Sequence, residues 1–166
     1  MPTPDFIVQL RSKIGHDPLW LPGVTGVVFD SAADPQRVLL VQRADNRRWA
    51  LVTGILEPGE EPAAGLLREI EEETGVRAEL GALFDVDCTG PMTFPNGDVC
   101  SFLNITFKAV GVSGEAAVGD DESLAVAWHG LGDLPETLTD RHRRLIEAAR
   151  AHSGDGAAYS TPGTDH

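Results

Sequence analysis

The stretch from Gly54 to Val76 constrains this chain more than any other part, because it joins a glycine-bounded loop to a strongly acidic helix. Pro62 suits the first turn of a helix and Gly75 suits its end, so the sequence predicts a helix over residues 61–74. At 3.6 residues per turn one face should pack and the neighbouring arc should present carboxylates. The predicted packing face holds Ala63, Leu66, Leu67, Ile70 and Thr74, and the acidic arc holds Glu69, Glu72 and Glu73.

Carboxylates spaced i, i+3 and i+4 converge on a small volume, and they repel one another unless a divalent cation neutralises them. Hard oxygen ligands without nearby Cys or His favour Mg²⁺, with Mn²⁺ as a second choice, over zinc or copper. Glycines at both ends of the preceding loop would let its backbone approach an ion or a phosphate closely. A run of glutamates by itself more often marks a solvated helix face, so the wider pattern has to decide.

That wider pattern is Gly54, five residues, Glu60, seven residues, Arg68-Glu69-Ile70, one residue, Glu72-Glu73, one residue, Gly75-Val76. It resembles the Nudix box of the Nudix hydrolases at every defined position. The resemblance extends over about residues 20 to 150. One departure precedes the box, where many members read Leu-Pro-Gly-Gly and this chain reads Leu-Val-Thr-Gly over residues 51–54.

The resemblance implies an α/β fold, a Nudix-type α/β/α sandwich with a mixed β-sheet, together with the short N-terminal helix. It implies a metal-dependent hydrolase that cleaves a diphosphate bond in a nucleoside diphosphate linked to another moiety. The implied metal site comprises Glu69, Glu72 and Glu73 with support from Gly54 and Glu60. Arg68 is implied to orient a carboxylate, and either Glu69 or Glu72 would take the proton from the attacking water.

Residues outside the box are weaker candidates. Members of the family often add a loop carboxylate, and the candidate here is Glu122, although Asp120 and Asp121 compete and a plain acidic turn explains the segment equally well. Arg43 and Arg48 flank a turn near the box and are candidates to bind a substrate phosphate. Phe94 begins a Phe-Pro-Asn-Gly-Asp stretch that resembles a Tyr-Pro-Asn-Gly-Asp stretch of one group of Nudix proteins, and the resemblance implies a role in shaping the substrate pocket. A plain hairpin turn explains Asn-Gly equally well.

The rest of the chain predicts one domain over residues 1–152, with a helix and lead-in over 1–19 and a flexible tail over 153–166. Apolar runs predict strands at 23–29, 37–42, 49–53, 78–88, 99–110 and 124–129, and a last helix follows Pro135. Cys88 and Cys100 lack a metal-ligand spacing and are interpreted as reduced core residues, a disulfide between them being the weaker interpretation.

The charge balance narrows the class of partner. The chain has 26 acidic and 13 basic residues and a net charge of -13, which argues against binding a nucleic-acid polymer. Its start has no basic segment followed by an apolar one, and no run approaches the ~20 apolar residues of a membrane span, so we expect a cytoplasmic protein without a membrane segment. The expected partner is a small nucleotide-like diphosphate, and a homodimer is possible. Two alternatives stay open: a clean-up nucleoside triphosphate pyrophosphatase, and a non-catalytic nucleotide-sensing module.

Overall fold

The computed structural model describes residues 4–119, 123–152, 154 and 158–159. Its elements in chain order are α1 (Asp5–Ile14), β1 (Leu19–Phe29), β2 (Arg37–Arg43), β3 (Trp49–Ala50), β4 (Val52–Ile55), α2 (Pro62–Thr74), β5 (Arg77–Thr93), β6 (Val99–Ser113), β7 (Ser123–Gly130), α3 (Asp140–Ala151) and β8 (Ala158–Tyr159). Among the described residues, no helix has the length and apolar character needed to cross a membrane.

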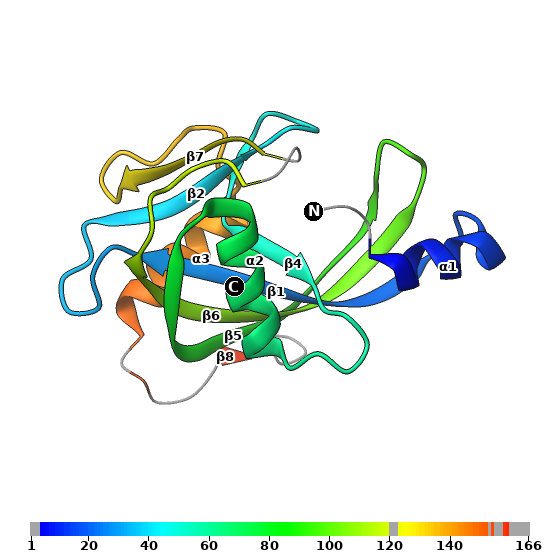
Figure 1. Cartoon of the computed structure of the whole chain (residues 1–166), viewed down its shortest axis with the longest axis horizontal. Helices are drawn as coiled ribbons and strands as arrows, with labels where there is room; N and C mark the ends of the chain where they lie inside the picture. Colours follow the sequence, from blue (N-terminus) through cyan, green and yellow to red (C-terminus); the bar gives the residue numbers. More distant parts are fainter. Residues whose placement is uncertain (1–3, 120–122, 153, 155–157, 160–166) are drawn as a thin grey trace.

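The strands form one mixed sheet in the order β3-β2-β1-β6-β5-β8, with β4 also paired to β1 and β7 to β2. β1 and β6 are parallel along the whole of β1, from Leu19 opposite Cys100 to Phe29 opposite Val110. β5 and β6 form a long antiparallel hairpin. Helix α2 covers one face of this sheet and α3 covers the other (Figure 1). The predicted α/β/α sandwich with a mixed sheet and a short N-terminal helix is therefore confirmed.

Alternation along β1 divides the core into two clusters, because successive side chains of a strand point to opposite faces. Val24 and Val28 pack with Leu66 and Ile70 of α2. Val27 and Phe29 face the other way and belong to the cluster that holds Leu145 and Ile146 of α3. One apolar strand thus holds both helical layers, which explains why the run over 23–29 contains so few polar residues.

The turn end of the β5–β6 hairpin and α1 form an arm that projects from the body of the domain (Figure 1). Ile7 of α1 packs with Leu21, Phe102 and other residues in a third cluster on the face that α3 covers further along the sheet. Arg11 fastens the helix to the hairpin, because its guanidinium lies 3.2 Å from Asp98 and donates to the Val99 carbonyl at 3.1 Å. The predicted hairpin turn at Asn-Gly is present.

The packing face predicted for α2 is partly wrong. Ala63 and Leu67 are exposed, whereas Gly65 and Glu69 are buried beside Leu66, Ile70 and Thr74. The cause is Gly65: a Cβ there would press on Leu56 and Glu60, so its absence lets the preceding loop fold against the helix. The loop therefore packs at Gly65, a position outside the predicted face, and leaves Ala63 and Leu67 exposed.

Other predictions need smaller corrections. The segment 49–53 forms two strands, β3 and β4, that pair with different partners. The helix predicted after Pro135 is α3, which begins at Asp140, where the Thr139 side chain caps it. Cys100 is a buried free thiol as expected, but Cys88 is exposed because it lies on the arm, beyond the cover of α2. Of the predicted tail, the structure describes only Gly154 and β8, which pairs with β5.

The first turn of α3 carries a pH-dependent group. Burial, and then the positive charge of Arg141, lower the pKa of His142 to about 4 from 6.5. The fold favours the neutral imidazole, so between pH 4 and 6.5 the unfolded chain binds more protons and the stability falls as the pH falls. We expect His142→Gln to flatten the decline in unfolding free energy over this interval by on the order of 3 kcal/mol. Urea unfolding at several pH values measures it, and parallel curves for the two proteins would contradict the assignment.

Candidate active site

The most deeply buried charged side chain of the described residues, Glu69, lies where α2 meets β4. Glu69 is 0% exposed. A Cβ at Gly54 would overlap its Cγ and Cδ, so only a glycine at that position of β4 leaves room for this carboxylate. Arg68 Nη1 donates to Glu69 Oε1 at 3.1 Å, and Oε2 is buried without a hydrogen-bond partner among the described residues. A buried carboxylate oxygen without a donor is costly, and it is the atom that a cation would satisfy.

Arg68 joins the box carboxylates to one another. Its Nε and Nη2 form a fork with Glu60, at 2.9 and 3.0 Å, and its Nη1 also donates to Glu72 at 3.1 Å. Glu60 in turn accepts the backbone N–H of Glu57 at 3.0 Å, which closes the loop ahead of α2. One guanidinium therefore fixes the loop and two turns of the helix in a single arrangement.

The electrostatics of these groups differ because their burial differs. The Arg68 hydrogen bond lowers the pKa of Glu60, and the same bond raises the pKa of Arg68 above its ordinary value. Burial raises the pKa of Glu69 to about 7, although the charge and hydrogen bond of Arg68 oppose that shift. The network thus contains one carboxylate, Glu60, whose ionised form is stabilised, and a second, Glu69, whose ionised form is poorly compensated in the described residues.

The remaining acidic candidates lie along the outer side of α2. Glu72 is exposed and Glu73 is partly buried. The loop after β6 runs beside them, since Gly119 donates its N–H to the Glu73 carbonyl at 3.1 Å. Glu122, with Asp120 and Asp121, lies outside the described residues.

These residues fit a hard divalent cation in chemistry. The donors are carboxylates, one buried oxygen is unsatisfied, and the glycine at position 54 leaves space beside it. Among the described residues, no three acidic, His or Cys side chains are already gathered into a ready-made cluster. Arg68 bridges Glu69 and Glu72 at 3.1 Å each, so the guanidinium now supplies the positive charge between them.

Of the three substrate candidates outside the box, Arg43 and Arg48 lie together, since the Arg43 N–H donates to the Arg48 carbonyl at 2.9 Å, and Phe94 lies apart from them. Arg43 forms a fork with Asp45, at 2.9 and 2.7 Å, in the turn after β2. Arg48 is exposed in the same turn. Phe94 packs edge-to-face against Phe102 in the cluster under α1, so the structure places it within the arm.

A row of polar side chains crosses four strands on the face that α3 covers, and the sequence analysis did not identify it. Asp85, Thr106, Thr25 and Thr53 stand opposite one another in β5, β6, β1 and β4. Thr25 and Thr106 are fully buried, and neither hydroxyl has a hydrogen-bond partner among the described residues. We call these four residues the polar row. Single polar residues inside apolar strands were the available signal, but only the register shows that they align.

The N-terminal turn of α3 borders the polar row. Arg141 forks onto Asp87 at 2.9 and 2.7 Å, and Arg144 lies 3.8 Å from Asp85. Asn104, opposite Asp87, donates to Thr89 at 3.0 Å. Charged and hydrogen-bonding groups therefore surround the row on the arm side.

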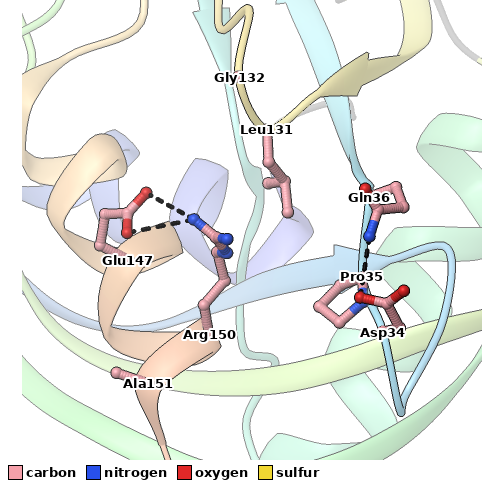
Figure 2. Close-up of a pocket in the computed structure, with 8 residues that line it drawn as sticks. All are labelled: Asp34, Pro35, Gln36, Leu131, Gly132, Glu147, Arg150 and Ala151. Atoms are coloured by element: carbon pink, nitrogen blue, oxygen red, sulfur yellow. Dashed lines mark hydrogen bonds and ion pairs between the residues drawn. The ribbon is translucent and has the colours of Figure 1, made fainter.

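A hollow of about 620 Å³ lies elsewhere, between the turn after β1 and the last turns of α3 (Figure 2). Figure 2 shows Glu147 and Arg150 pointing toward each other on one side of the hollow, and Gln36 and Asp34 together on the other side. Arg150 donates to Glu147 at 3.4 Å and Gln36 donates to Asp34 at 2.9 Å. None of its lining residues belongs to α2 or β4. In the hollow Arg150 pairs with Glu147 and Asp34 accepts from Gln36, whereas Glu69 keeps an unsatisfied oxygen among the described residues, so the carboxylates of α2 are the better candidate site.

Comparisons with known proteins point to one family. A family model described as a NUDIX domain matches residues 20–149. A MutT-like protein from Streptomyces ambofaciens is 32% identical over 82% of this chain and 86% of its own length. A Homo sapiens protein named as an 8-oxo-dGDP phosphatase is 32% identical over 81% of this chain, which spans 38% of that protein. The crystal structure of a MutT NUDIX hydrolase from Burkholderia pseudomallei matches with a TM-score of 0.63 at 28% identity, over 78% of this chain and 98% of the other.

The contact between Gly54 and Glu69 gives a test of this geometry. Gly54→Ala should destabilise the fold by about 1 to 3 kcal/mol, because the new methyl group forces the buried carboxylate out of its place. Gly132→Ala is the matched control, since nothing lies within 4 Å of a Cβ there, and it should change stability by less than about 0.5 kcal/mol. Chemical unfolding compares the two, and equal effects would show that Glu69 does not occupy this position.

Proposed function

The chain belongs to the Nudix hydrolase family, enzymes that act on nucleoside diphosphate derivatives, and we propose that it cleaves the diphosphate bond of a nucleoside diphosphate linked to another moiety. One observation carries the proposal: Arg68 holds Glu60, Glu69 and Glu72 together beside Gly54, and leaves one buried oxygen of Glu69 unsatisfied. A site built only to hold itself together would not bury an unpaired carboxylate oxygen.

In this proposal Glu69, Glu72 and Glu73 bind Mg²⁺, and Gly54 and Glu60 keep the site in shape. Family enzymes generally use divalent metal ions, and Mg²⁺ suits an all-carboxylate donor set. A bound cation would lower the pKa of a water molecule and neutralise charge on the phosphoryl group. Mn²⁺, which prefers similar ligands, is the expected substitute.

The chain's own residues would hold the carboxylates in place and accept the proton of the attacking water. Arg68 keeps Glu69 and Glu72 at fixed positions, 3.1 Å from one nitrogen, so that either can accept the proton of the attacking water. Arg43 and Arg48 are proposed to meet the outer phosphate, which requires Arg43 to leave Asp45. Glu122 is proposed as a further carboxylate of the site.

The rest of the substrate is proposed to pass the partly exposed strand β4. Thr53 and Gly54 are consecutive in β4, so Thr53 lies in the polar row while Gly54 faces Glu69 on the opposite side of the same strand. Thr25 and Thr106 are fully buried, so a substrate with its diphosphate at the carboxylates would meet the row at the partly exposed Thr53. Such an arrangement favours a polar moiety over an apolar one.

A second candidate function is the removal of oxidised nucleotides. The relative named as an 8-oxo-dGDP phosphatase is what favours it. The same carboxylates would serve either reaction, because both break a phosphoanhydride bond. The two functions differ in the group beyond the diphosphate.

A substrate screen decides between them. Purified protein with Mg²⁺ would be incubated with ADP-ribose, nucleotide sugars, dinucleoside polyphosphates and ordinary and 8-oxo nucleoside di- and triphosphates, and the products separated by chromatography. The proposal expects a nucleoside monophosphate and a phosphorylated second moiety from a linked substrate. Preferential turnover of oxidised nucleotides would establish the second candidate instead. Binding of any of these without turnover would leave a non-catalytic module.

Two neighbouring glutamates of α2 give a matched pair for the metal assignment. Glu72 and Glu71 are exposed to nearly the same extent, at 54% and 53%, and each pairs with an arginine. Glu72→Gln should lower kcat on the order of 10²-fold and weaken Mg²⁺ binding, because it removes a ligand or base. Glu71→Gln should leave both within about twofold.

Steady-state kinetics measures the change in kcat, and calorimetry with Mg²⁺ measures the change in metal binding. The triple variant with Gln at positions 69, 72 and 73 should lose metal binding while circular dichroism shows the fold retained. Unchanged metal affinity in the triple variant, or equal losses for the two single variants, would remove α2 from the metal site.

A further inference from the structure

The turn between β2 and β3 carries two arginines that no acidic group of the described chain neutralises. Arg47 and Arg48 are exposed, and neither side chain forms a hydrogen bond or an ion pair with the residues that the structure describes. The other arginines each contact a carboxylate or a carbonyl oxygen. With 26 acidic residues to 13 basic ones, unpaired guanidiniums are unexpected, and these two are free to bind an anion from outside the chain. We call residues 43–48 the basic turn.

The backbone of Arg47 lies in the left-handed region, with a φ of 60°. Outside the glycines, no other residue of the described ranges has a positive φ. Glycine, asparagine and aspartate fit this region more easily than a long side chain does, and Asp45 and Asn46 stand just before it in the same turn. Strained positions of this kind gather at sites of function. The arginine side chain therefore needs a reason beyond the shape of the turn.

Hydrogen bonds inside the basic turn fix the backbone from which the two guanidiniums extend. The Arg47 N–H donates to the Arg43 carbonyl at 2.9 Å, and the Arg47 carbonyl accepts from the Gln42 amide at 3.0 Å. The Arg48 N–H donates to the Asn46 side chain at 2.9 Å. A turn that is held in advance loses little freedom when it binds a ligand.

Contacts tie the basic turn to the elements of the candidate active site. Arg43 pairs with the first residue of β7, and Gly119, four residues earlier in the chain, donates its N–H to the Glu73 carbonyl of α2. Gly54 follows Arg48 by six residues, so at most about 20 Å of extended chain separates them. The basic turn is thus a neighbour of the acidic helix and carries the opposite charge.

Opposite charges on neighbouring elements suit a ligand that needs both. The carboxylates of α2 repel a phosphate unless a cation lies between them. The guanidiniums of the basic turn attract a phosphate directly, and the planar fork of each can donate to two of its oxygens. A phosphate group is therefore the anion that matches the turn, and a metal ion is not required to hold it there.

We propose that Arg47 is a specificity-determining residue that binds, together with Arg48, a phosphate group of the substrate that the metal ion does not hold. The inference rests on the proposed function, because it takes the substrate to be a phosphate compound. It deepens that function, because it selects substrates that present a phosphate to the basic turn while the cleaved bond lies at the carboxylates of α2.

Binding of inorganic pyrophosphate to the full chain, in EDTA and at low salt, tests the proposal without catalysis. A phosphorus NMR titration should detect binding to the wild type, and Arg47→Gln should weaken it on the order of tenfold, because charge-assisted hydrogen bonds are lost. Arg77→Gln is the matched control, since it removes the same charge from a side chain that is exposed at 70% but pairs with Glu71. The control should change the affinity less than about twofold.

The strained backbone supplies a second measurement, with an effect of the opposite sign. Arg47→Gly removes the strain together with the side chain, so it should melt no lower than the wild type while it loses the same pyrophosphate affinity. Arg48→Gly relieves no strain, because the φ of Arg48 is not positive, and it should melt about 1 to 3 °C lower than the wild type. An Arg47→Gly variant that binds pyrophosphate as the wild type does would overturn the proposal.

Kinetics separates this inference from the proposed function. On a substrate found by the screen, Arg47→Gln should raise KM on the order of tenfold and keep kcat within about twofold, because Arg47 holds the substrate and transfers no proton. Arg47→Lys keeps the charge without the fork and should recover part of the loss.

The outcomes distinguish the two claims. A chain that binds pyrophosphate through Arg47 but hydrolyses no diphosphate would refute the proposed function and leave Arg47 as an anion-binding residue. A wild type that binds no pyrophosphate would overturn the inference and leave the proposed function in place. Equal affinities of Arg47→Gln and Arg77→Gln, or an Arg47→Gln variant in which kcat falls and KM does not change, would overturn it as well.

Discussion

The burial of the Glu69 carboxylate determines how the other residues of the candidate active site are arranged. Removing a charged group from water is expensive unless other groups compensate, and here the compensation comes mainly from one guanidinium. Arg68 reaches Glu69 at 3.1 Å while its other nitrogens hold Glu60 at 2.9 and 3.0 Å. The loop, the helix and β4 are consequently positioned by one set of contacts, and Gly54 is required because Glu69 occupies the space where its side chain would be.

β1 connects the site around Glu69 to the rest of the fold, because its two faces pack against different helices. Its even-numbered residues face α2 and its odd-numbered residues face α1 and α3. Along one side the strand passes from the exposed Trp20 to the buried Val24, and along the other from Leu21 to Thr25 and then Phe29. The α2 core, the polar row and the α3 core therefore all lie along the same strand.

Local patterns in the sequence predicted the elements and the family. Period-2 and period-3.6 apolar runs predicted the helices and the longer strands, and the fixed spacing from Gly54 to Val76 predicted which side chains of α2 share an arc. The roles of those side chains stay predictions, because the structure shows their positions and not their chemistry. Glu122 stays a prediction as well, since it lies outside the described residues.

What the sequence did not predict depends on contacts between distant segments. The polar row exists only through the registers of β5, β6, β1 and β4, which no single strand encodes. The buried face of α2 differs from its periodicity because a loop packs against Gly65. Cys88 is exposed because the sheet continues beyond α2, and the length of a helix does not say how much of a sheet it covers.

The excess of acidic residues bears on how a substrate could reach the candidate site. An anionic substrate cannot approach a group of carboxylates without a cation between them, so acidity makes the proposed active site depend on metal. Because salt screens charge over a short distance, a metal ion bound beside Glu69 would change the potential at the carboxylates strongly and the potential over the rest of the acidic surface very little.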